Sequence, residues 1–258
     1  MEEVQDNYYS RQLLLEGWNQ SAISDLRVLV VGLGAIGNET VKNLCMLGVK
    51  RISGLDFDVV EASNLSRCLM FNKTHVENKV FKADAVQEFV KNRFPHVEFT
   101  SFNCKVEDFD FEKNYFDVIL CCLDNLSSRL HVNANAYSKS VIIDSGIFGF
   151  NGKIQVVGLT GPCIECVTTD SDYEKMWEKF SCSGETLQII EEKVPSLITL
   201  ASIVSGLQVQ AMINYSILKN KDSYAVFYNG MQNSFMKLQT TLKKGCPVHV
   251  EEKPLDSC

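Results

Sequence analysis

Apolar runs and amphipathic stretches alternate along the first 150 residues of the chain. Short, mostly apolar runs predict strands buried on both faces, at residues 27–32, 51–57, 97–106, 116–124 and 141–150. Apolar residues at helical spacing between these runs predict helices, at residues 36–47, 76–93 and 127–140. Because strands and helices take turns, we expect an α/β fold with a doubly wound, Rossmann-like and mostly parallel sheet.

The rest of the chain has a different pattern. Period-two alternation predicts antiparallel strands that continue the sheet, at residues 152–159, 224–230 and 235–242. Residues 167–193 are polar and weakly periodic, so we expect a long crossing loop with a short helix. A long and largely buried apolar helix is predicted to begin just after Pro195. Residues 1–25 form a polar lead-in with a predicted helix around Ser10–Gly17.

Composition narrows the class of protein. Hydrophobic residues make up 45% of the 258 residues, enough for a sizeable core. The net charge of -7 argues against sequence-independent nucleic-acid binding, which needs a cationic face. No apolar run approaches the roughly 18 residues of a membrane helix, and residues 1–12 lack the pattern of a signal peptide. We therefore expect a cytoplasmic protein whose ten cysteines are thiols and metal ligands.

A glycine pattern marks a nucleotide site. Gly32, Gly34 and Gly37 form GxGxxG between a predicted strand and a predicted helix. Glycines there let phosphate approach the backbone N–H groups at the helix N-terminus. The same glycines could serve only close packing of the strand on the helix, so the pattern needs support from other residues.

That support comes from a polar cluster after the second predicted strand. Asp56 ends the strand, where a carboxylate can accept hydrogen bonds from ribose hydroxyls. Further polar side chains follow, at Asp58, Asn64 and Arg67, with Lys79 and Lys82 on the next predicted helix. Guanidinium and ammonium groups suit a triphosphate, so the cluster favours ATP over a nicotinamide cofactor. The alternative is a solvated charged loop.

Asp124 ends the predicted strand 116–124, at the sheet edge where ligands bind. A carboxylate there suits Mg²⁺, which keeps waters and takes one or two carboxylates. The neighbouring Asn125 and Arg129 could instead cap the next helix and pair locally.

Two cysteine-containing pairs predict a metal site. Cys163 and Cys166 form CxxC, and Cys246 with His249 forms CxxH. Together they make a tetrahedral zinc site with three thiolates and one imidazole. Because no coordination position stays open, we expect the Zn²⁺ to be structural. Free thiols are the alternative, and Cys258 competes only if the tail folds back.

On these motifs the chain resembles the ThiF/MoeB superfamily, which includes the ubiquitin-activating enzymes. The matching stretches follow the family order: YSRQ (9–12), VLVVGLGAIG (28–37), DFDVVEASNLSR (56–67), CLDNLSSR (122–129), IFGFNGKI (147–154), PCIEC (162–166) and GCPVH (245–249). The resemblance implies that the C-terminal carboxylate of a ubiquitin-like protein, ending in Gly-Gly, attacks the α-phosphate of ATP. We expect one domain that spans 1–258 and forms a homodimer. Residues 1–160 would bind the nucleotide, and residues 161–258 would contain the zinc site, the crossing loop and the substrate-binding part.

The resemblance also implies roles for individual residues. Asp56 matches the ribose-binding position, Asn64 and Arg67 match a triphosphate-binding pair, and Asp124 matches the Mg²⁺-binding aspartate. Arg11 matches an arginine that reaches the ATP of the partner subunit.

Two features depart from the family pattern. Cys68 stands where the family has glutamine. The catalytic lysine is either Lys79 or Lys82, and Lys82 fits only with a two-residue insertion. We favour Lys82 because Ala-Asp-Ala follows it in the family manner.

Cys182 lies in the crossing loop, at a spacing after CIEC that resembles the catalytic cysteine of heterodimeric activators. The resemblance implies a thioester on Cys182 and a downstream conjugating enzyme. Three alternatives stay open: adenylation of a sulfur carrier, a non-catalytic partner subunit, and a nicotinamide-dependent oxidoreductase.

Overall fold

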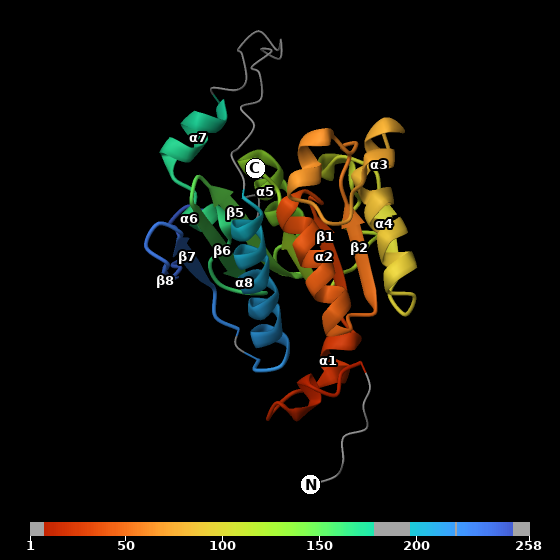
Figure 1. The fold of residues 1–258 in the computed structure, drawn as a ribbon. Coiled ribbons are helices and arrows are strands. Elements are labelled where there is room, and N and C mark those ends of the chain that lie inside the picture. Colours follow the sequence, from red (N-terminus) through yellow and green to blue (C-terminus); the bar gives the residue numbers. More distant parts are fainter. Residues whose placement is uncertain (1–7, 178–196, 220, 250–258) are drawn as a thin grey trace.

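The computed structural model describes residues 8–177, 197–219 and 221–249 (Figure 1). Within these residues, the strands form one sheet in the order β3-β2-β1-β4-β5-β6-β7-β8. The strands are β1 (Arg27–Val31), β2 (Arg51–Leu55), β3 (Glu98–Phe102), β4 (Val118–Cys121), β5 (Val141–Phe148), β6 (Asn151–Val157), β7 (Tyr224–Asn229) and β8 (Ser234–Gln239). The described helices are η1 (Gln12–Leu14), α1 (Gln20–Ser24), α2 (Ala35–Leu47), η2 (Ala62–Ser66), α3 (Lys73–Glu77), α4 (Lys82–Arg93), η3 (Val106–Asp108), α5 (Leu126–Ala136), α6 (Ile164–Val167), α7 (Asp170–Trp177) and α8 (Ile198–Ser216).

The sheet has a parallel half and an antiparallel half. Strands β3, β2, β1, β4 and β5 pair in parallel, and β6, β7 and β8 continue the sheet as antiparallel hairpins. The α/β fold predicted from the sequence is therefore confirmed. Because the first five strands run the same way, the loops after β1, β2 and β4 meet at one edge of the sheet.

Helices cover both faces of the parallel half (Figure 1). Val28 and Val30 of β1 pack in a cluster with α2, α4 and α8. Leu29 and Val31 point to the other face, into a cluster with α5 and α6. A strand between two apolar layers must be apolar at every position, which explains the uninterrupted run in the sequence.

The prediction of a single helix over 76–93 is wrong. Helix α3 ends at Glu77, and α4 begins only at Lys82. Between them Phe81 forms an antiparallel bridge with Val59, and the N–H of Val60 donates to the carbonyl of Val80. Because these residues pair with another segment, they cannot continue the helical hydrogen bonds, and Lys79 adopts a left-handed φ of 50°.

Two smaller differences concern the termini of the predicted elements. The helix expected around Ser10–Gly17 is only the short 3₁₀ turn η1. Helix α1 follows it unpredicted, with the Asn19 side chain accepting from the N–H of Ala22. Helix α7 is the short helix expected in the crossing loop, and α8 begins near the predicted place.

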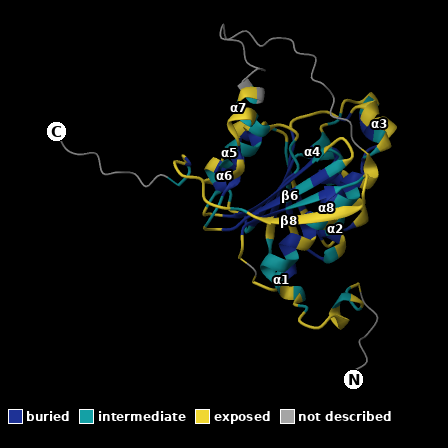
Figure 2. Ribbon diagram, turned by 90° about the vertical axis from the view of Figure 1, so that its left-hand side faces the viewer, coloured by how far each residue is buried: buried dark blue, intermediate teal, exposed yellow. Residues whose placement is uncertain are grey.

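Helix α8 is buried along one side against α2, β5 and β6. None of the helices in the described ranges has the length and apolar character needed to cross a bilayer. Strand β8, by contrast, is exposed along its whole length at the end of the sheet (Figure 2).

Candidate functional site

At the glycine loop, the backbone of β1 and α2 comes very close to the end of β4. A Cβ on Gly37 would lie 2.0 Å from the carbonyl oxygen of Gly32. A Cβ on Gly32, whose φ is 87°, would lie 2.7 Å from the carbonyl oxygen of Cys122. Helix α2 begins after Gly34 with no side-chain cap, so no capping side chain accepts from its first N–H groups. This arrangement leaves backbone donors for an anion.

Asp56 connects the end of β2 to this loop. Its Oδ2 accepts from the N–H of Leu33 at 2.7 Å, and its Oδ1 accepts from the N–H of Asp58 at 2.9 Å. The residue is only 9% exposed. Burial raises the pKa of Asp56, and this outweighs the opposing effects of Lys82 and the two N–H donors. Each carboxylate oxygen keeps a lone pair for a hydroxyl donor.

Lys82 joins the same cluster. Its Nζ lies 2.6 Å from Oδ2 of Asp58, and its side chain is 12% exposed. Burial lowers the pKa of Lys82, but the carboxylates of Asp56 and Asp58 outweigh burial and raise the pKa above its ordinary value. The ammonium group is therefore charged at neutral pH. Lys79, the other candidate, is exposed and lies in the turn between α3 and α4.

The predicted triphosphate pair lies in and just after η2. Oδ1 of Asn64 accepts from the N–H of Glu61 at 2.9 Å, which fixes this buried amide. Arg67 is half-buried and donates to the carbonyl of Ser63 at 2.6 Å. Cys68 is buried, and burial raises its pKa to about 11. At neutral pH its thiol is protonated, so at this position the chain has a packing residue and no nucleophile.

Asp124 lies exposed in the loop after β4. The next residue, Asn125, caps α5, because its Oδ1 accepts from the N–H of Ser128 at 2.8 Å. The contact between Gly32 and the carbonyl of Cys122 places the beginning of this loop against the glycine loop.

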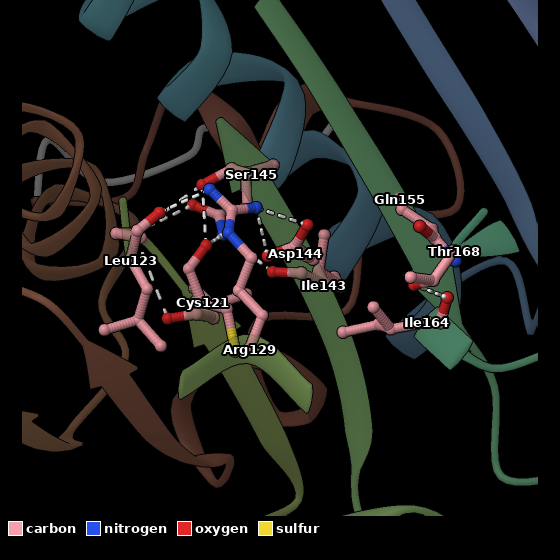
Figure 3. A network of polar contacts seen from close by, with 12 residues as sticks. Cys121, Leu123, Arg129, Ile143, Asp144, Ser145, Gln155, Ile164 and Thr168 are labelled. Atoms are coloured by element: carbon pink, nitrogen blue, oxygen red, sulfur yellow. Dashed lines mark hydrogen bonds and ion pairs between the residues drawn. The ribbon is translucent and has the colours of Figure 1, made fainter. Parts of the chain in front are cut away.

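Arg129 forms an ion pair that the sequence did not specify. Its Nη1 donates to both carboxylate oxygens of Asp144, at 2.6 and 2.5 Å (Figure 3). Its Nη2 donates to the carbonyl of Leu123. Asp144 is fully buried in β5. A lone carboxylate inside an apolar run of the sequence is the signal that could have identified this pair.

Arg11 lies away from the other candidates. Nε2 of the adjacent Gln12 donates to the carbonyl of Leu47 at 3.1 Å, so this segment sits at the C-terminal end of α2. The glycine loop lies at the opposite end of the helix (Figure 1). The 13 residues of α2 span about 20 Å at 1.5 Å per residue. Arg11 therefore does not join the glycine loop of its own chain.

The predicted metal ligands come together from two distant segments. Cys163 and Cys166 flank the start of α6, and Cys246 and His249 follow β8. The ligand atoms all lie within 4.8 Å of one another. Sγ of Cys163 lies 3.9 Å from Sγ of Cys166 and 3.7 Å from Sγ of Cys246. Tetrahedral zinc with bonds of about 2.3 Å separates its sulfur ligands by roughly 3.8 Å, so the spacing fits.

The surroundings of the cluster also fit a cation. Nε2 of His249 is buried and has no hydrogen-bond partner among the described residues. Hydrogen bonds from the N–H groups of Lys243 and Cys163 outweigh burial and lower the pKa of Cys166. Burial raises the pKa of Cys163 to about 12, so one thiolate forms more readily than the other. A metal ion would stabilise all the thiolates and use the free imidazole nitrogen.

The predicted nucleophile, Cys182, lies outside the described residues.

Comparison with known proteins identifies the family. The ThiF family matches residues 9–248. The chain belongs to the ThiF family. It is 37% identical over 150 residues to SUMO-activating enzyme subunit 2 of Dictyostelium discoideum. The aligned region covers 56% of this chain and 22% of that protein. The chain thus spans about a quarter of the length of the SUMO-activating relatives that it matches.

Two other similarities extend over nearly the whole chain. Molybdopterin-synthase adenylyltransferase of Salmonella typhimurium is 29% identical over 254 residues, covering 93% of this chain and 94% of that protein. The crystal structure of E. coli MccB with ATP superposes with a TM-score of 0.74 at 16% identity, covering 96% of this chain and 75% of MccB. At that identity, the likeness to MccB shows the fold.

Removal of one thiolate tests the metal site. We expect about one zinc per wild-type chain by mass spectrometry, and a loss of zinc in Cys166→Ser. Because structural zinc contributes to folding, a loss of about 3 kcal/mol would lower the melting temperature by about 10 °C. Cys104→Ser, which removes a thiol outside the cluster, is the control. Equal zinc contents and melting temperatures for wild type and Cys166→Ser would argue against the site.

Proposed function

We propose that the chain activates the C-terminal carboxylate of a ubiquitin-like protein by adenylation with ATP. The observation that carries this proposal is the meeting of the glycine loop, Asp56, Asp58 and Lys82 at one sheet edge, beside the Asp124 loop. A nicotinamide site would use the glycines and Asp56, but it has no need for a charged lysine among carboxylates.

The side chains of this edge match the parts of ATP. The N–H groups at the start of α2 would bind phosphate oxygens. Asp56 would accept hydrogen bonds from the ribose hydroxyls. Arg67, which is half-buried, would turn from the Ser63 carbonyl to the triphosphate, beside Asn64. Asp124 would hold Mg²⁺, which neutralises charge on the triphosphate when bound.

In the proposed reaction, a carboxylate oxygen of the substrate protein attacks the α-phosphorus. The new bond joins that oxygen to phosphorus, and the bond to the pyrophosphate oxygen breaks. Negative charge develops on the equatorial and leaving oxygens. Lys82, released from Asp58, would stabilise this charge, and positioned cations supply most of the catalysis in such reactions.

We also propose that the chain acts as a homodimer and holds a structural Zn²⁺ at the cysteine–histidine cluster. Arg11 lies at the far end of α2 from its own nucleotide site, which supports a role across a subunit interface. Exposed apolar side chains flank it in the sequence, at Tyr8, Leu13, Leu14 and Leu15.

After adenylation, the Cys182 thiolate would attack the acyl carbon, and AMP would leave from that carbon. An enzyme that stops at the adenylate and serves a sulfur carrier is the second candidate. The match to molybdopterin-synthase adenylyltransferase over nearly its whole length favours this candidate.

ATP–pyrophosphate exchange tests the adenylation step. We expect wild-type chain to catalyse exchange in the presence of a ubiquitin-like protein ending in Gly-Gly. Lys82→Ala should lower kcat/KM about 100-fold, equivalent to about 2.7 kcal/mol, because it removes a cation from the developing charge. Lys79→Ala should change it by less than about threefold, because Lys79 lies outside the cluster. No exchange by the wild type would favour a non-catalytic subunit, and NADH binding would favour an oxidoreductase.

Mixed dimers test whether Arg11 acts across the interface. Arg11→Ala and Asp124→Ala should each be nearly inactive alone. Random mixing should restore about one quarter of wild-type exchange, because half the dimers are mixed and each contains one intact centre. Unchanged inactivity, with mixed dimers verified by two affinity tags, would contradict a role in trans.

A non-reducing gel tests the thioester. With ATP and the ubiquitin-like protein, we expect a conjugate that dithiothreitol removes and that Cys182→Ala lacks. Cys104→Ala should retain it. Normal ATP–pyrophosphate exchange without any conjugate would contradict the thioester and favour adenylation of a sulfur carrier.

A further inference from the structure

Gln208 is a fully buried amide on α8 whose polar atoms are all used. Its Nε2 donates to the carbonyls of Cys121, at 3.1 Å, and Ile143, at 2.7 Å. Its Oε1 accepts from Oγ1 of Thr40 at 3.1 Å and from the thiol of Cys122 at 3.4 Å. One side chain therefore connects α8 to α2, β4 and β5.

These bonds hold the place where β4 leaves the sheet. The N–H of Cys122 donates to the carbonyl of Val31 at 2.7 Å, beyond the last residue of β4. The carbonyl of Cys121 accepts from Nε2 of Gln208 and also from Oγ of Ser145, at 2.7 Å. Side chains thus fix the carbonyl from which the Asp124 loop starts.

The same loop is held from the other face of the sheet. There Arg129, paired with Asp144, donates to the carbonyl of Leu123 (Figure 3). Helix α8 covers one face and α5, which carries Arg129, covers the other. The carbonyls of Cys121 and Leu123 are therefore fixed from opposite sides, immediately before Asp124.

An amide at this buried position needs a reason, because an unpaired buried amide is costly and an apolar residue packs more simply. Its neighbours on the buried side of α8 are mostly small or apolar, among them Val204, Val209 and Met212. Asp124 itself is exposed, and its carboxylate has a hydrogen bond only at 3.5 Å, from Nδ2 of Asn125, among the described residues. The direction of its side chain therefore depends on the backbone that carries it.

We propose that Gln208 is a positioning residue that fixes the backbone before Asp124, so that the carboxylate faces the metal bound to the triphosphate. Arg129 performs the same task from the opposite face. This inference rests on the proposed function for the role of Asp124, and it assigns no contact between Gln208 and substrate.

Gln208→Met tests this role, because it keeps the volume and removes every hydrogen bond of the amide. Ser205→Ala is the matched control. Ser205 is also buried on α8, but among the described residues its Oγ bonds only to Thr40 and Asn43 of α2. Both variants should lower the melting temperature, whereas only Gln208→Met should disturb the Asp124 loop.

The readout is Mn²⁺ binding to the complex with a non-hydrolysable ATP analogue, followed by electron paramagnetic resonance. We expect about tenfold weaker Mn²⁺ binding in Gln208→Met, equivalent to about 1.4 kcal/mol, and less than about twofold change in Ser205→Ala. The Mg²⁺ concentration for half-maximal exchange should rise in parallel. Arg129→Lys should weaken Mn²⁺ binding in the same way. This variant replaces Gln208→Met in the test if Gln208→Met does not fold.

Equal Mn²⁺ affinities for Gln208→Met and Ser205→Ala would overturn the inference, as would unchanged affinity in a folded Arg129→Lys. The titration needs no turnover. Wild-type chain that binds Mn²⁺ and the nucleotide but catalyses no exchange would therefore defeat the proposed function alone. Wild-type exchange with unchanged Mn²⁺ affinity in Gln208→Met would defeat the positioning role alone.

Discussion

The buried carboxylate of Asp56 organises the carboxyl edge of the sheet. It needs hydrogen bonds because a buried anion without donors is costly. The N–H of Leu33 supplies one from the glycine loop, and the N–H of Asp58 supplies another from the segment that follows β2. The same segment then binds Lys82 through the Asp58 side chain, so Asp56 and the residue two places after it bring three parts of the edge together.

The sheet could be predicted because its strands are buried on both faces and therefore apolar at every position. The metal cluster could be predicted because the spacing of its ligands reflects their chemistry. The break before Lys82 could not, since Val59 and Phe81 pair across the chain and local periodicity contains no sign of it. The partners of Gln208 were also hidden, because a sequence shows an amide in an apolar helix but not which carbonyls it faces.

The cysteine–histidine cluster joins a mostly exposed segment after β8 to the buried start of α6. Strand β8 is exposed along its length, and the residues from Thr241 to Gly245 are exposed as well. Cys246 is the buried exception, and Nζ of Lys243 donates to the carbonyl of Thr168 at 2.9 Å nearby. Burial of apolar area stabilises the parallel half, while ligand bonds would take over that task in the segment after β8.

The turn between α3 and α4 has a consequence for how this chain can change over evolution. The position of Lys82 is set by its backbone hydrogen bond to the carbonyl of Asp58 and by the adjacent bridge, whereas the turn around Lys79 bonds mainly to the end of α3. Closing a slightly longer exposed loop costs little. A change in the length of the exposed turn around Lys79 would therefore leave the lysine that follows in place.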